Sequence, residues 1–182
     1  MAWCVLLLVR AACAGELDVV SAGLSAEDDA YVLNADFRAE LTARLEDVVS
    51  RGVPLYFVVD FELTRPRWYW FDEVLANKSR TFRLSYHALT RQYRLSTGVL
   101  HQNFDSLEEA LAILARIRDW AVADKGALKN GATYDAQLRL RLDLTQLPKP
   151  LQVTAIGSKE WNLSTDWYRF TYTPGRVEGV TK

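Results

Sequence analysis

The segment VPLYFVVDFELTRPRWYWFDE, residues 53–73, decides the fold, because it holds about a third of the aromatic side chains and a clear strand pattern. Its first half is apolar at every second position, namely at Leu55, Phe57, Val59, Phe61 and Leu63. Asp60 and Glu62 fall on the opposite parity. Since alternate residues of a strand point to opposite faces, this pattern predicts a strand with one buried face.

A turn at Arg65-Pro66-Arg67 should reverse the chain after this strand. Proline presets φ for the second position of a tight turn, and the residue before it avoids the helical region. Residues 68–71 would then form the returning strand of a hairpin. They are aromatic on both parities, so either both faces of this strand are covered or one face presents an exposed aromatic patch.

The rest of the chain predicts further strands and two short helices. Alternating apolar residues favour strands at residues 19–24, 31–38, 82–86, 93–95, 100–104, 120–122, 134–144, 153–156 and 167–172. A helical period that starts at Leu41 ends at Gly52. The capping box at residues 106–109 starts a second helix, whose apolar stripe runs to Ile117.

This order of elements lacks the regular alternation of strands and helices that a parallel sheet needs. We therefore expect a mainly β fold: an antiparallel β-sandwich, immunoglobulin-like in general architecture, with two short α-helices. An open sheet with both helices on one face is the alternative. The expected division is a signal peptide at residues 1–14, a single domain at residues 15–174 and a disordered tail at residues 175–182.

Composition excludes some classes of protein. The 182 residues suffice for one domain with a substantial core. An apolar fraction of 49% excludes a disordered chain, and a net charge of −1 excludes a generally basic nucleic-acid binder. An electrostatic partner must therefore be met by a local patch.

The first residues, MAWCVLLLVRAACA, predict export to the periplasm with a cleaved signal peptide. Residues 3–9 have the length of a signal-peptide core, and Ala12-Cys13-Ala14 supplies a small-x-small cleavage pattern. The apolar run is too short for a transmembrane helix, which needs about 20 residues. Cys13 could also be the modified cysteine of a lipoprotein signal. That signal needs an aliphatic residue three positions before the cysteine, where this chain has Arg10. Cleavage after residue 14 removes both cysteines and with them disulfides, zinc-thiolate sites and cysteine nucleophiles.

Residues that could carry catalysis are few. The two histidines, His87 and His101, form no close-spaced ligand motif, and no nucleophile elbow, P-loop or metalloprotease motif is present. Asp60 and Glu62 would lie roughly 7 Å apart on a strand face, a spacing that glycosidases use. Such acids more commonly pair with neighbouring arginines on a solvated face. We expect a non-enzymatic protein without a cofactor or metal.

Charge distribution gives a stronger indication. Residues 78–104 contain no Asp or Glu but several cations. If the apolar positions of this segment point inward, Arg83, His87 and Arg94 share the outward face, where arginine forks could bind carboxylates or phosphates. The predicted partner-binding residues are Arg80, Arg83, His87, Arg91 and Arg94. In the alternative interpretation these arginines pair across strands with Asp60, Glu62, Asp72 or Glu73.

Tryptophans offer a second candidate surface. Trp68, Trp70, Trp161 and Trp167 could form a platform for sugar rings or for a protein partner. Most tryptophans of a sandwich belong to its core. Trp161 is expected to be the most exposed, because it lies in a loop at residues 158–164.

Four long strings carry a family resemblance: RGVPLYFVVDFELTRPRWYWFDE (51–73), SRTFRLSYHALTRQYRLSTG (79–98), LRLRLDLTQLPKPLQV (138–153) and WNLSTDWYRF (161–170). With them the chain resembles the proteobacterial domain-of-unknown-function family 4390 over residues 19–174. The resemblance implies an exported envelope protein without an assigned activity, and no catalytic residues are carried over. It also implies genes that neighbour membrane sensor kinases resembling nitrogen-regulation sensors.

These observations favour a non-enzymatic periplasmic interaction module that binds another envelope protein. A membrane sensor kinase is a candidate partner through the resemblance, nucleic acid is not expected, and the chain is not expected to cross the membrane. The alternative is a module that binds glycans or lipid headgroups through Trp68, Trp70 or Trp161. A hydrolase is the third hypothesis and would use Asp60, Glu62 or His87.

Overall fold

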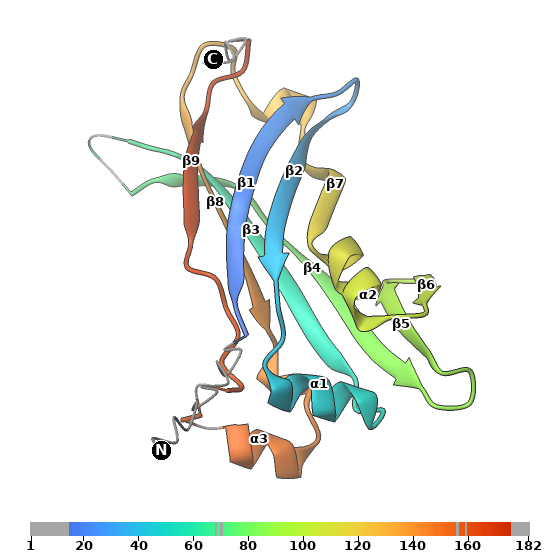
Figure 1. Cartoon of the computed structure of the whole chain (residues 1–182). Coiled ribbons are helices and arrows are strands. Elements are labelled where there is room, and N and C mark those ends of the chain that lie inside the picture. Colours follow the sequence, from blue (N-terminus) through green and yellow to red (C-terminus); the bar gives the residue numbers. More distant parts are fainter. Residues whose placement is uncertain (1–14, 68, 70, 156, 159, 176–182) are drawn as a thin grey trace, which may run out of the picture.

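The computed structural model describes residues 15–67, 69, 71–155, 157–158 and 160–175 (Figure 1). The described strands form two antiparallel sheets. The smaller has the order β1-β2-β7 and consists of β1 (Leu17–Ala26), β2 (Ala30–Ala39) and β7 (Arg116–Asp124). The larger has the order β6-β5-β4-β3-β8-β9 and consists of β3 (Leu55–Arg65), β4 (Glu73–His87), β5 (Gln92–Thr97), β6 (Leu100–Phe104), β8 (Tyr134–Leu142) and β9 (Tyr168–Tyr172).

The two sheets enclose one hydrophobic core, as a sandwich requires. Leu33 and Ile117 from the smaller sheet and Phe57 and Leu138 from the larger are each at most 1% exposed and belong to one cluster. The predicted mainly β, antiparallel fold is confirmed. An immunoglobulin domain sets strands ABED against CFG, and the strand order here gives no support to that finer likeness.

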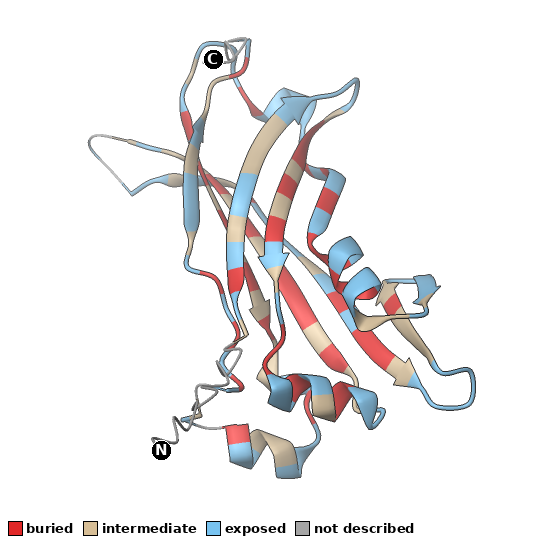
Figure 2. Ribbon diagram, in the orientation of Figure 1, coloured by how far each residue is buried: buried red, intermediate tan, exposed pale blue. Residues whose placement is uncertain are grey.

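β3 is the centre of the larger sheet, because it pairs with β4 on one side and β8 on the other. Its apolar positions from Leu55 to Leu63 are almost completely buried, as their alternation predicted (Figure 2). Each such side chain contributes about 1.5–3 kcal/mol of transfer free energy. Asp60 and Glu62 lie on the opposite face of the strand, as expected.

The hairpin turn is longer than the sequence indicated. The returning strand begins at Glu73, and of residues 68–71 the described Tyr69 and Phe71 are 67% and 85% exposed and lie in the loop. The Glu73 carboxylate forms ion pairs with both Arg65 and Arg67. These ion pairs join the two ends of the loop at the point where we expected the returning strand to begin. Trp68 and Trp70 lie outside the described residues.

Both predicted helices are present. In α1 (Ala43–Ser50) the Thr42 hydroxyl caps the Leu45 amide at 3.2 Å, and in α2 (Leu107–Leu114) the Ser106 hydroxyl caps the Glu109 amide at 3.1 Å. α2 is shorter than predicted, because the chain passes at Arg116 into β7, where Ile117 is buried as a strand residue. Two short 3₁₀ helices, η1 (Lys125–Ala127) and η2 (Leu144–Gln146), flank β8.

The strand predicted at residues 153–156 is wrong, because the chain forms a third helix there, α3 (Lys149–Ala155). Proline suits the start of a helix, and the Pro148 carbonyl accepts hydrogen bonds from the amides of Leu151 and Gln152. The Gln152 side chain also donates to the carbonyls of Thr145 and Leu147, which ties the helix to the segment before it.

α2 covers the core side of the arm formed by β4, β5 and β6. It contacts β5 and β6 as well as β2 and β7, and its Leu111 and Leu114 share the core cluster with Leu84 and Leu95 of the arm. α1 contacts β4. No described helix covers the other face of the arm, where the side chains of β4, β5 and β6 are exposed or half-buried except for the buried Ser85 (Figure 1). None of the helices in the described part of the chain has the length and apolarity needed to cross a bilayer.

Candidate functional site

Strand register brings the predicted basic residues of the arm to one face. Arg83 pairs with Ser96, Ser85 with Arg94, and His87 with Gln92, so these side chains point the same way. On β6, Asn103 and His101 continue the row opposite Arg94 and Ser96. We call Arg83, His87, Arg94 and His101 the basic face.

The arginine and histidine side chains of the basic face have no acidic partner among the described residues. Arg83 and His87 are exposed, and no hydrogen bond or ion pair joins their side chains to another described residue. Arg94 is half-buried, and its Nε donates to the amide oxygen of Asn103 at 3.0 Å. The alternative interpretation, pairing with acids across strands, does not describe these residues.

Two of the predicted binding residues lie elsewhere. Arg80 belongs to the core face of β4, where its guanidinium carbon lies 4.8 Å from the centroid of the Trp120 ring. Alternation along β4 separates it from Arg83, and burial lowers the pKa of Arg80. Arg91 is exposed in the turn between β4 and β5, where its φ is +55°. The shared face therefore holds Arg83, His87 and Arg94 of the predicted set.

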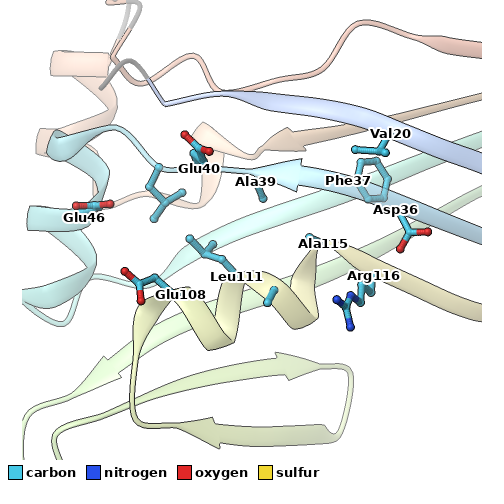
Figure 3. Close-up of a pocket in the computed structure, with 12 residues that line it drawn as sticks. Val20, Asp36, Phe37, Ala39, Glu40, Glu46, Glu108, Leu111, Ala115 and Arg116 are labelled. Carbon is cyan, nitrogen blue, oxygen red and sulfur yellow. The ribbon is translucent and has the colours of Figure 1, made fainter. Parts of the chain in front are cut away.

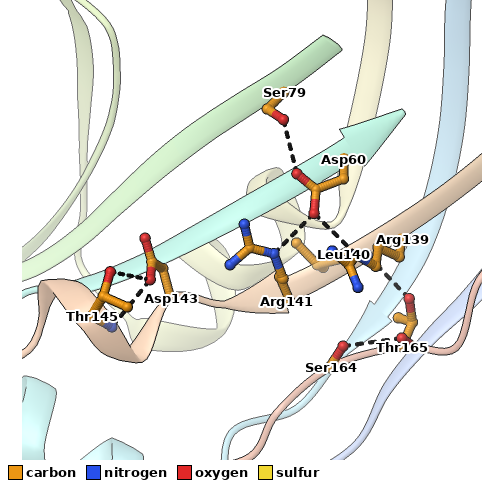
Figure 4. A network of polar contacts seen from close by, with 9 residues as sticks. All are labelled: Asp60, Ser79, Arg139, Leu140, Arg141, Asp143, Thr145, Ser164 and Thr165. Atoms are coloured by element: carbon orange, nitrogen blue, oxygen red, sulfur yellow. Dashed lines mark hydrogen bonds and ion pairs between the residues drawn. The ribbon is translucent and has the colours of Figure 1, made fainter. Parts of the chain in front are cut away.

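Asp60 forms a separate charged cluster on the same side of the larger sheet (Figure 4). Its carboxylate accepts hydrogen bonds from Ser79 Oγ at 2.8 Å, Arg141 Nε at 2.9 Å and Arg139 Nε at 3.0 Å. Burial raises the pKa of Asp60, but the hydrogen bonds from Arg141, Ser79 and Arg139 outweigh it, so that the pKa lies below its ordinary value. An ionised carboxylate held in this way is unsuited to donate a proton.

The acids proposed for catalysis thus both have structural partners. Glu62 accepts a hydrogen bond from Gln137 Nε2 at 3.0 Å. The arginines that neutralise Asp60 come from β8 and not from the acid-free segment at residues 78–104. In the described part of the chain, no group of three or more His, Cys, Asp or Glu side chains is placed to hold a metal ion.

The aromatic surface predicted from the tryptophans is largely absent among the residues described. Trp161 is 1% exposed, contrary to expectation, because its loop is bound along β8 by hydrogen bonds from the Leu142 amide to the Leu163 carbonyl and from the Thr165 amide to the Leu140 carbonyl. Trp167 is half-buried, and the Arg139 guanidinium lies 4.4 Å from its ring centroid. Trp68 and Trp70 are not described.

One cavity that the sequence did not indicate lies between β2, α1 and α2 (Figure 3). It measures about 610 Å³, and we call it the acidic groove. Its floor is apolar and its rim carries carboxylates. The floor residues are Phe37, Ala39, Leu41, Leu111 and Ala115, and the rim residues are Asp36, Glu40, Glu46, Glu108 and Arg116. Because the carboxylates come from three separate elements, no local pattern marks them as a group.

A second cavity of about 700 Å³ lies beside the β3–β4 loop; we call it the outer cavity. Gln137 connects two of its walls, since its amide donates to Glu62 at 3.0 Å and accepts from Arg169 Nε at 3.3 Å. Asp135, Thr171, Phe71 and Phe170 also line it. Glu62 is thus the only one of the proposed catalytic acids and bases found in the lining of this cavity as described.

Comparison with known proteins identified a family but no function. The sequence model of a family described as "Domain of unknown function (DUF4390)" matches residues 14–171. No curated protein matches the chain. No solved structure matches it.

Proposed function

Since the chain belongs to DUF4390, a family described only as a domain of unknown function, we propose from the surfaces of the fold that the protein is a non-catalytic interaction module. It binds an acidic surface of a partner protein through the basic face. The observation that carries this proposal is the uncovered row of Arg83, His87 and Arg94, which has no carboxylate partner among the described residues.

The chemistry of the basic face favours carboxylates. An arginine guanidinium matches a carboxylate with two parallel hydrogen bonds. Of the neutral side chains beside the arginines, Ser85 is buried and the Gln92 amide already donates to Asp105 at 3.0 Å, so the arginines carry the recognition. Each exposed ion pair contributes only about 0.2–1 kcal/mol. The face therefore contributes orientation and association rate more than affinity, and contacts at its margins would have to supply the rest.

The cell envelope is the place we propose for this interaction. The apolar run at residues 3–9 and the small-x-small pattern that ends at Ala14 support export to the periplasm. The extracytoplasmic part of a membrane sensor kinase is the first partner to test, because the family resemblance implies neighbouring sensor genes.

A double charge reversal tests the proposal. Arg83→Glu/Arg94→Glu should clearly reduce capture of the partner that wild-type protein retains from an envelope extract, since the face then repels carboxylates. The matched control is Arg38→Glu/Lys129→Glu, which reverses two exposed cations outside the basic face. Identical partner profiles for wild type and the double reversal would refute the proposal.

The outer cavity favours a second candidate function, glycan binding. Ligand clefts are typically lined by aromatic side chains with a few polar groups. Here Glu62, Gln137 and Arg169, which could bind sugar hydroxyls, line the same cavity as Phe71 and Phe170. Calorimetric titration with peptidoglycan fragments should then show saturable binding, and Gln137→Ala should weaken it. Vesicles of anionic lipid serve as the comparison, and a signal that stays constant with both additives would dismiss this candidate.

A further inference from the structure

The acidic groove combines an apolar floor with three carboxylates that no other described residue neutralises. Glu40, Glu46 and Glu108 are exposed, and no hydrogen bond or ion pair joins their side chains to another described residue. Figure 3 shows them around one end of the groove, while Asp36 and Arg116 lie at the other. Asp36 is already bound to Arg118, and the Arg118 hydrogen bond lowers the pKa of Asp36.

The electrostatics of the helix starts explain two of these three carboxylates but not the third. Glu46 and Glu108 lie in the first turns of α1 and α2, where a negative charge is favourable in any helix. Glu40 follows the end of β2 and has no such reason to be acidic. Both helix starts and the end of β2 meet at one groove, which concentrates negative charge over apolar surface.

The backbone of β2 is open at this groove. Pairing of β2 with β7 stops at Asp36 and Arg116, whereas pairing with β1 on its other side continues to Ala39 and Leu17. The Phe37 amide, on the groove side, donates to the Ala115 carbonyl at 2.8 Å. Backbone groups of a strand repeat with period two, so the Ala39 amide points to the same side and meets no strand among those described.

We propose that the acidic groove binds an extended segment of a partner protein in which lysine or arginine residues flank a bulky apolar side chain. The apolar side chain lies on Leu41, Leu111 and Ala115, the cations meet Glu40, Glu46 and Glu108, and the segment's backbone pairs with β2 at Ala39. A volume of about 610 Å³ falls within the range of about 300–1,000 Å³ typical of binding clefts.

This site is separate from the basic face and has the opposite charge. α2 covers the core side of the arm and contributes Leu111 to the groove, and its C-cap residue Ala115 also lines it, whereas the basic face lies on the other side of the arm. The inference therefore does not depend on the proposed function, and the two can fail independently.

Short labelled peptides test the groove on the full-length protein. Fluorescence anisotropy should show binding of the pentapeptide Lys-Leu-Phe-Leu-Lys. The acidic peptide Glu-Leu-Phe-Leu-Glu and the basic but non-apolar peptide Lys-Ser-Gly-Ser-Lys should bind at least about tenfold more weakly. Equal binding of all three peptides would overturn the proposal.

Variants then locate the binding. Glu40→Gln/Glu46→Gln/Glu108→Gln should weaken binding of the basic apolar peptide about tenfold, and Ala112→Trp should block the groove from the exposed side of α2. The matched control Glu27→Gln/Glu109→Gln/Glu160→Gln removes the same charge at exposed sites outside the groove and should bind as wild type. Arg83→Glu/Arg94→Glu should also leave the peptide affinity unchanged.

Two results would contradict this assignment. If the control triple variant loses as much affinity as the groove variant, net charge and not the groove attracts the peptide. If sedimentation shows a dimer of the wild-type protein that Ala112→Trp dissociates, the occupant is a second copy of the chain and not a basic partner segment.

Discussion

Asp60 connects three strands through its carboxylate. It lies on β3 and accepts hydrogen bonds from Ser79 on β4 and from Arg139 and Arg141 on β8. The two arginines lie side by side on the same face of β8, so without Asp60 their charges would repel each other. Asp60 therefore stabilises the sheet, and its acidity reflects this role.

The substitution Asp60→Asn should lower the free energy of unfolding by about 1–2 kcal/mol at pH 7. A hydrogen bond to a charged group contributes about 1.5–3 kcal/mol, and solvent screening lowers this value because the arginines are about a third exposed. Urea unfolding followed by circular dichroism measures it. The control is Asp18→Asn, at an exposed carboxylate with no hydrogen bond to another described residue, which should cost nothing measurable.

The same carboxylate predicts a pH dependence. The folded-state pKa of Asp60 lies below that of an unfolded aspartate, about 3.9, so its contribution is complete above that pH and is lost as the pH falls through the folded-state pKa. The stability difference between wild type and Asp60→Asn should therefore shrink as the pH is lowered from 5 to about 3. A difference that stays constant over this range would show that the interaction is not ionic.

At the scale of elements, the sequence predicted those strands and helices that are determined by interactions between residues close together in the chain. The alternation in β3 and the capping serine of α2 act within a few residues, and both predictions agree with the structure. Of the strand expected at residues 153–156, the described part up to Ala155 is the end of α3, and of the returning arm expected at residues 68–71, the described Tyr69 and Phe71 lie in a loop. The hydrogen bonds of the Gln152 side chain and the ion pairs of Glu73 join residues several positions apart beside these segments. No periodicity reports such contacts.

Thr42 connects helix α1 with the distant loop that contains Trp161. Its hydroxyl caps α1 at the Leu45 amide and donates to the Glu160 carbonyl at 2.9 Å, which holds the loop that carries Trp161. Thr42→Val should cost about 1–2 kcal/mol in the free energy of unfolding and expose Trp161 to acrylamide quenching. Thr42→Ser keeps the hydroxyl and should restore both values. A loss of stability without increased quenching would confine the role of Thr42 to the helix cap.

At the scale of the whole molecule, the candidate sites depend on how the elements are brought together. Parity alone places Arg83, His87 and Arg94 on one face, so the sequence predicted that part of the basic face. The same alternation assigns Arg80 to the opposite face, but its partner there, the Trp120 ring of the distant strand β7, could not be read from the sequence. The acidic groove could not be predicted for the same reason, because its four carboxylates come from β2, from the segment that follows β2, from α1 and from α2.

The arm that carries the basic face should be the less stable part of the molecule. All residues of β6 except Phe104 are exposed, whereas β3 is buried between two neighbouring strands. Local opening costs little where few apolar contacts break, so amides of β6 should exchange with deuterium much faster than those of β3. Hydrogen exchange measured by mass spectrometry tests this order.

Partner binding at the basic face should then slow exchange in β5 and β6 and leave β3 unchanged, whereas a peptide in the acidic groove should protect α2 and the end of β2. Uniform exchange across β3 and β6 would mean that the sandwich and the arm open as one unit, and docking at either surface would then protect both.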